Sequence, residues 1–406
     1  MQYGKSSSLF LSSAILLLGA ITARADFVAH EWGTFSSVQG SDGTLMEGLQ
    51  HEEEGLPAFV YGRDGLLTKS GAPQSFVCQQ KCKRIETPLM SGTLLAVNQK
   101  METPVIYFYS DRAQKVSVSV QFPGGVISQW YPNSSSFLPA IGEIKSLANG
   151  LMSWDVEISP EKQSIPDVSP EDICAPARIV NSNYVRVGTE AEKFIFYRGL
   201  GRFSVPIQVQ SQAQELKVFN HSDETIADAF LIQFDGRRGS VRSLGKISSQ
   251  SGNNYGPISA GPESLKELDT YLQDVSSQLK TALEKSGLYT DEAEAMVATW
   301  SKSYFKTPGV RILYVLPRAW TDRLLPIQFQ PTPEKLVRTL IGRVEILTAQ
   351  EESKLSADVK EVSASGEKVM TDHLGRFAEP KLLRVKQLTT DSQLKSKVDR
   401  LLRSLN

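Results

Sequence analysis

Apolar and polar residues alternate with a period of two over much of the region from residue 26 to about residue 245. Apolar side chains occupy every second position in residues 115–122, 152–158 and 203–209. Such alternation predicts strands with one buried and one solvated face. Gly, Pro and Asn residues separate these short strands, so we expect residues 26–245 to form an antiparallel β-sandwich.

The apolar spacing changes after residue 245. Residues 246–261 are rich in Ser, Gly and Asn, which predicts a connector. Apolar residues, all leucine except Val275, then recur at intervals of three and four from residue 265 to residue 283, a helix pattern. Strand-like apolar runs at residues 310–316 and 336–347 and further amphipathic stretches follow, and Thr348 with Glu351 has the pattern of a capping box. We therefore expect residues 262–406 to be an α+β region with about four helices packed on the sandwich, in a mixed, β-rich α+β chain.

The first 25 residues have the pattern of a secretory signal peptide. Lys5 precedes a mostly apolar run over residues 9–21, and Ala23 and Ala25 occupy the −3 and −1 positions of a cleavage site. The rest of the chain has no apolar run long enough to cross a membrane. We therefore expect an exported protein, periplasmic or extracellular, with no membrane span in the mature chain.

Charge and cysteine content narrow the function classes. The 44 Lys and Arg residues nearly balance the 45 Asp and Glu residues. The chain therefore lacks the excess of basic residues that is typical of nucleic-acid-binding proteins. In an oxidising compartment the three cysteines predict one structural disulfide, although the sequence leaves its pairing open among Cys78, Cys82 and Cys174. Three cysteines with no nearby His match no standard zinc spacing.

Two carboxylates fall on apolar faces of predicted strands, Glu31 and Glu102. A carboxylate in apolar surroundings is costly unless it is paired or protonated. If these two lie close together, they are candidates for the acid and base of a hydrolase, with His30 or Arg198 as a helper. Alternatively, a buried arginine neutralises each of them, and Arg198 and Arg343 occupy suitable positions.

Other signatures of chemistry are absent from the sequence. It contains no nucleophile elbow, phosphate loop, dinucleotide fingerprint or zinc-protease motif, so we predict no cofactor and no metal. A metal enzyme would have to gather His30 and acids from distant parts of the chain. That possibility is the third of our hypotheses.

Several longer motifs are distributed over both halves of the mature chain. They are HEWGTF at 30–35 with SDG at 41–43, METPVIYFY at 101–109, FYRGL at 196–200, GVRILYVLP at 309–317, IGRVE at 341–345 and LGRFAEP at 374–380. In these motifs the chain resembles a family of uncharacterised exported bacterial proteins. The resemblance implies that the two halves form one structural unit rather than two independent domains, and it implies no particular activity.

These observations lead to two main functional hypotheses. The first is a binding or structural protein of the cell envelope or the extracellular space that recognises a glycan or another envelope component. The second is a periplasmic or secreted hydrolase or lyase that uses Glu31 and Glu102. Whether these side chains meet in an open cleft or in a sealed, paired cluster distinguishes the two.

Overall fold

The computed structural model describes residues 26–51, 55–63, 96–140, 147–212, 215–258 and 264–405. The predicted signal peptide lies outside these residues, as do Cys78 and Cys82. No helix in the described part of the chain is both long enough and apolar enough to span a membrane.

A ten-stranded sheet forms the centre of the described structure. In spatial order its strands are β16 (Lys266–Glu267), β14 (Arg238–Ser243), β13 (Ala229–Phe234), β17 (Gly309–Val315), β19 (Lys335–Ile346), β1 (Val28–Gln39), β3 (Gln99–Tyr109), β10 (Ile195–Gly201), β5 (Gly125–Tyr131) and β2 (Tyr61–Gly62). The two long central strands β1 and β19 are parallel, and the other pairs are antiparallel. The two predicted regions therefore share one sheet.

Two smaller sheets pack on one face of this central sheet. The six-stranded sheet contains β18 (Ile327–Gln330), β4 (Gln114–Phe122), β7 (Gly150–Ser159), β8 (Tyr184–Val187), β9 (Glu190–Glu192) and β6 (Ser136–Leu138), and the three-stranded sheet contains β11 (Ile207–Gln212), β12 (Glu215–Asn220) and β15 (Ser251–Pro257). Alternate residues such as Val118 and Trp154 point inward and join Ile106 of the central sheet in one apolar core. The alternating pattern thus places apolar side chains on one face of each sheet, and these faces pack against each other.

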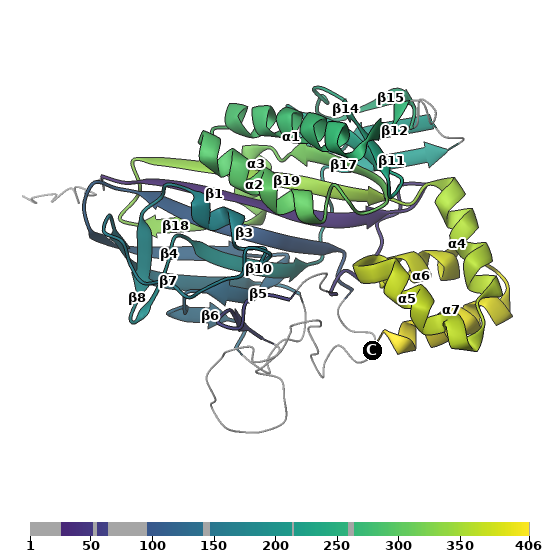
Figure 1. Ribbon diagram of the computed structural model, residues 1–406, viewed down its shortest axis with the longest axis horizontal. Coiled ribbons are helices and arrows are strands. Elements are labelled where there is room, and N and C mark those ends of the chain that lie inside the picture. The colour runs from purple at the N-terminus through teal and green to yellow at the C-terminus, as the bar shows by residue number, and fades with distance from the viewer. Residues whose placement is uncertain are drawn as a thin grey trace, which may run out of the picture.

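Helices cover the opposite face of the central sheet. They are α1 (Leu268–Lys285), α2 (Thr290–Lys302) and the short η2 (Pro176–Ile179). Their apolar side chains, including Leu279 and Met296, form a second core with Trp32 and Ile341 of the central sheet. Figure 1 shows α1 and α2 lying over the central sheet near β17 and β19, in roughly the same direction as these strands. The mixed α+β class is confirmed, with layers in the order sheet, sheet, helix.

The C-terminal helices form a group at one end of the strands (Figure 1). They are α4 (Ala349–Glu361), η4 (Ala364–Gly366), α5 (Glu367–Leu374), η5 (Gly375–Phe377), α6 (Ala378–Leu388) and α7 (Ser392–Ser404). Val359, Leu382 and Val398 belong to a small apolar core of their own. The group, called the C-terminal bundle below, is therefore held internally by its own side chains.

Two expectations about the second region were wrong. The predicted connector at 246–261 contains β15, a polar strand that pairs with β12 through its backbone and so lacks an apolar pattern. The described residues also form seven α-helices, α1, α2, α3 (Arg318–Leu324) and α4–α7, where about four were expected. Helices as short as α3 and α5 contain too few turns for an apolar stripe to be visible.

Candidate functional site

Glu31 lies on the face of the central sheet that meets the six-stranded sheet, and its side chain is fully buried. Its carboxylate accepts hydrogen bonds from the Tyr197 hydroxyl and from Nε of Arg338. Arg338 is the direct register partner of Glu31 in the parallel β1–β19 pair, and it also contacts Asp322. The expected arginine partner therefore exists, but it is Arg338 and neither Arg198 nor Arg343.

Glu102 lies on the opposite, helix-covered face. The Tyr304 hydroxyl donates to its Oε2 at 2.7 Å, and Nη1 of Arg376 donates to the same oxygen at 3.0 Å. Burial by itself would raise the pKa of Glu102, but nearby positive charges, first among them Arg376, outweigh it and hold the pKa far below the ordinary value of 4.5. Glu102 is therefore a stable carboxylate at neutral pH.

The structure thus does not bring the two predicted carboxylates together. Glu31 contacts side chains of the sheet–sheet core, whereas Glu102 contacts Tyr304 of the helix-side core. A general acid must carry a proton at the working pH, and the lowered pKa of Glu102 prevents this. The arrangement therefore gives no support to an acid–base pair made of these residues.

Around Glu102 lies a buried group of five charged side chains and one tyrosine, called the Glu102 cluster below. Its members are Glu102, Tyr304, Arg311, Arg343, Glu345 and Arg376. Oε1 of Glu345 accepts from Nε of Arg311 at 2.8 Å and from Nε of Arg343 at 2.6 Å. The Arg343 guanidinium lies 3.9 Å from the centre of the Tyr304 ring, a cation–π contact.

Four of the sequence motifs contribute to this cluster, those at 101–109, 309–317, 341–345 and 374–380. Since Arg376 belongs to η5, its salt bridge with Glu102 ties the C-terminal bundle to the central sheet. The convergence of the motifs on a buried, ion-paired cluster favours a structural role for it.

His30 and Arg198 each lie in separate surroundings. The Nδ1 atom of His30 is 2.7 Å from Oε2 of Glu292 in α2, and both side chains are fully buried. Arg198 is buried beside the Phe196 ring, 5.8 Å from its centre. His30 thus pairs with a carboxylate that the sequence analysis did not single out, because the contact spans 262 residues.

Cys174 is a free, buried thiol. Burial raises its pKa to about 12. Cys174 therefore takes no part in a disulfide, which goes against two of the three alternative pairings, while the third, Cys78–Cys82, lies outside the described residues. Within the described part of the chain, no group of three or more His, Cys, Asp or Glu side chains is placed to hold a metal ion.

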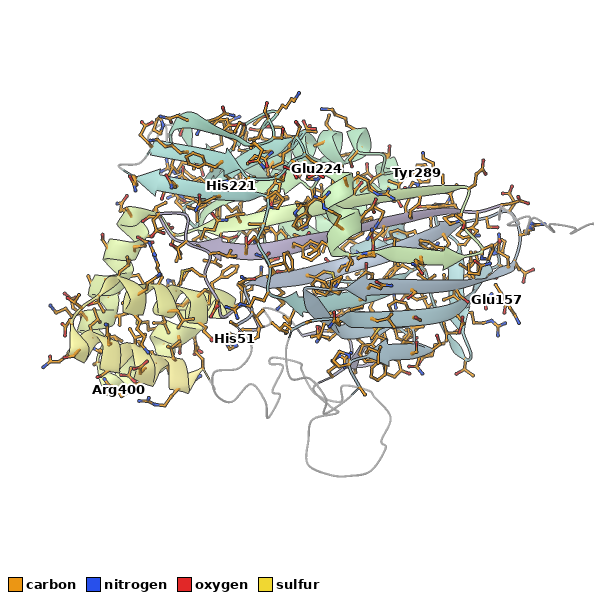
Figure 2. The ribbon with its side chains drawn as sticks, turned by 180° about the vertical axis from the view of Figure 1, so that it is seen from behind. His51, Glu157, His221, Glu224, Tyr289 and Arg400 are labelled. Atoms are coloured by element: carbon orange, nitrogen blue, oxygen red, sulfur yellow. The ribbon has the colours of Figure 1, made fainter. Side chains whose placement is uncertain are left out.

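An open cleft lies on the outer face of the six-stranded sheet, with a volume of about 470 Å³. It is lined by Lys115 and Ser117 of β4, Asp155 and Glu157 of β7, and Arg186 of β8. Ser117 donates to Asp155, and Arg186 forms a salt bridge with Glu157. Figure 2 labels Glu157 at the outer edge of the molecule. This cleft was not predicted from the sequence, although its residues occupy the polar positions of the alternating strands.

Comparison with known proteins assigns no family. The chain matches no family model and no curated protein sequence. Solved structures with some likeness include the yeast delta-COP-I mu-homology domain complexed with the Dsl1 WxWxV peptide, at 7% identity, TM-score 0.27 and coverage of 79% of this chain and 96% of that one. Another is the Danio rerio Fcho1 mu homology domain with bound Eps15 peptide, at 6% identity, TM-score 0.28 and coverage of 80% and 98%. These values are too low to assign a fold or a ligand.

Proposed function

We propose that the protein is an exported binding protein that recognises a glycan or another polar component of the cell envelope in the cleft of the six-stranded sheet. One observation carries the proposal. The open polar cleft lies at the surface, whereas the candidate catalytic carboxylates Glu31 and Glu102 are buried and held by arginines. Binding requires an accessible concave surface with a few polar groups, and the cleft has both.

The side chains of the cleft suit a ligand rich in hydroxyl groups. Asp155 and Glu157 accept hydrogen bonds, while Lys115 and Arg186 donate them. A sugar hydroxyl does both, so it can join a donor and an acceptor of the same cleft. The Ser117–Asp155 and Arg186–Glu157 contacts hold these groups in place before a ligand arrives, which lowers the entropic cost of binding.

The signal-peptide pattern in the sequence supports this proposal. A leader of the kind predicted at residues 1–25 would deliver the protein to the compartment that contains envelope glycans. The hydrolase hypothesis lacks a comparable observation, because Glu31 and Glu102 lie on opposite faces of the sheet.

The test is retention of the purified full-length secreted protein on beads that carry peptidoglycan or a panel of polysaccharides. We expect the wild type to be retained and the Asp155→Asn/Glu157→Gln variant to bind about tenfold more weakly, because charge-assisted hydrogen bonds are lost. Asp167→Asn, at an exposed position outside the cleft, is the matched control and is expected to bind like the wild type. Absence of retention on every bead, or equal retention of all three proteins, would contradict the proposal.

A further inference from the structure

The polar surface of the six-stranded sheet continues beyond the cleft. In one row of register partners, Gln330 of β18 lies beside Ser117 of β4, which lies beside Asp155 of β7. The next row crosses four strands and consists of Gln328 of β18, Ser119 of β4, Ser153 of β7 and Ser136 of β6. The residues between these positions along each strand point into the apolar core, so the two rows share the outer face.

The uncharged members of these rows form what we call the polar platform. They are Gln328, Gln330, Ser117, Ser119, Ser136 and Ser153. Because neighbouring strands lie about 4.8 Å apart, the platform measures about 14 Å from β18 to β6. Its side chains carry hydroxyl and amide groups and no charge, so the face offers both hydrogen-bond donors and acceptors. It could therefore contact several units of a chain-like ligand at once.

The charges beside the platform cancel. The next row of register partners consists of Lys115, Glu157 and Arg186. Together with Asp155, this end of the sheet has two cations and two anions. A site for a polyanion or a polycation needs an excess of the opposite charge to attract its ligand. The charge balance here favours an uncharged ligand instead.

On the other side of the platform the row begins with Gln121 of β4 and continues with two apolar residues. Leu151 of β7 pairs with Leu138 of β6, and Leu138 is 53% exposed. A protein partner would be expected to meet aromatic or otherwise apolar residues at the centre of its contact surface. Here the apolar residues are confined to one edge, where they can pack against the C–H face of a sugar ring.

We infer that the polar platform extends the cleft into one continuous site, and that its ligand is an uncharged polysaccharide chain lying across the strands, along the rows. This inference rests on the proposed function and specifies its ligand. The rows run perpendicular to the strands, so each strand crossed offers the chain another hydroxyl or amide group. The two rows lie about 7 Å apart along the strands, so the cleft contacts one side of the chain and the row from Gln328 to Ser136 contacts the other side.

Affinity electrophoresis of the full-length protein tests the inference. The gels contain an uncharged polysaccharide, either dextran, a soluble β-glucan or hydroxyethyl cellulose, or a polyanion, either alginate or heparin. We expect retardation by at least one uncharged polysaccharide, independent of salt, and none by the polyanions. The triple variant Ser119→Ala, Ser153→Ala, Gln328→Ala is expected to weaken that binding by about tenfold or more, through the loss of several hydrogen bonds.

The matched control is Ser396→Ala with Gln393→Ala, the same residue types at exposed positions of α7, and it is expected to bind like the wild type. A second variant, Ser153→Asp, adds a charge to the middle of the platform and is expected to weaken binding without removing core contacts. Circular dichroism of each variant verifies that it is folded.

Different outcomes overturn different statements. Salt-sensitive binding of a polyanion would overturn the inference and leave the proposed function standing. Binding lost by Asp155→Asn/Glu157→Gln but unchanged in both platform variants would also overturn the inference and confine the ligand to the cleft. Absence of binding to any polysaccharide or peptidoglycan would overturn the proposed function together with the inference.

Discussion

Glu102→Gln removes a negative charge from a buried group that is rich in arginine. In the native protein the Glu102 carboxylate accepts from the Tyr304 hydroxyl at 2.7 Å and from Nη1 of Arg376 at 3.0 Å. The positive charges of Lys100 and Arg343 also act on it. The amide of glutamine keeps the size of the side chain and one acceptor oxygen but neutralises none of these charges.

The expected loss follows from the burial of both partners. Removing one member of a buried ion pair costs about 3–5 kcal/mol, because the remaining charge stays desolvated. Arg376 and Glu102 are both nearly inaccessible to solvent, so solvent screening reduces this value little. A loss of that size is a large part of the stability of a typical folded protein, about 5–15 kcal/mol.

The assay is urea unfolding followed by tryptophan fluorescence, repeated from neutral to acidic pH. Because the folded-state pKa of Glu102 is lowered, the charged interaction stabilises the protein above the ordinary carboxyl pKa of 4.5 and is lost as the pH falls below it. The wild type should therefore exceed the variant by about 3–5 kcal/mol at neutral pH, and this difference should shrink in acid. Glu361→Gln, at an exposed position of α4, is the control and should unfold like the wild type.

Two results would refute this reasoning. A difference below about 1 kcal/mol at neutral pH would mean that the pair contributes no more than a surface ion pair. A difference that is equally large at neutral and acidic pH would mean that the loss comes from packing rather than from the charge of Glu102.

Three further predictions concern the core. Arg338→Met is expected to cost about 3–5 kcal/mol in urea titrations because it leaves Glu31 buried without its cation, and adding Glu31→Leu should recover most of this loss. Iodoacetamide should leave Cys174 unmodified in the native protein, because burial raises the pKa of its thiol to about 12, and should modify it in denaturant, as mass spectrometry would show. Gly342→Ala places a methyl carbon 2.2 Å from Cζ of Tyr314 and is expected to cost about 1–3 kcal/mol in thermal unfolding. A double variant no more stable than Arg338→Met, rapid labelling of the native thiol, or unchanged melting would contradict these predictions in turn.

Local patterns predicted the elements that depend on nearby residues. The strands predicted at residues 115–122, 152–158 and 336–347 correspond to β4, β7 and β19. The capping box at Thr348 formed as expected, because its two hydrogen bonds join residues only three positions apart. Such features carry their own signal in a short window of sequence.

Features that depend on distant partners could not be predicted in the same way. The apolar surroundings of Glu31 correctly indicated a buried carboxylate, but its partner Arg338 depends on the parallel register of β1 and β19. His30 and Glu292 are likewise joined only by the packing of α2 on β1. The cleft residues were overlooked for a different reason, since polar side chains on the outer face of a sheet are common and do not mark a site.

The parallel pairing of β1 with β19 has a consequence for biosynthesis. Glu31 and its register partner Arg338 are separated by 307 residues, so the ribosome releases β1 long before β19 exists. At typical synthesis rates the delay is about 15–60 s. During that time β1 can pair with β3, but the backbone groups of its other edge remain unpaired and can hydrogen-bond to other chains. The central sheet therefore cannot be completed until the last third of the chain has been made.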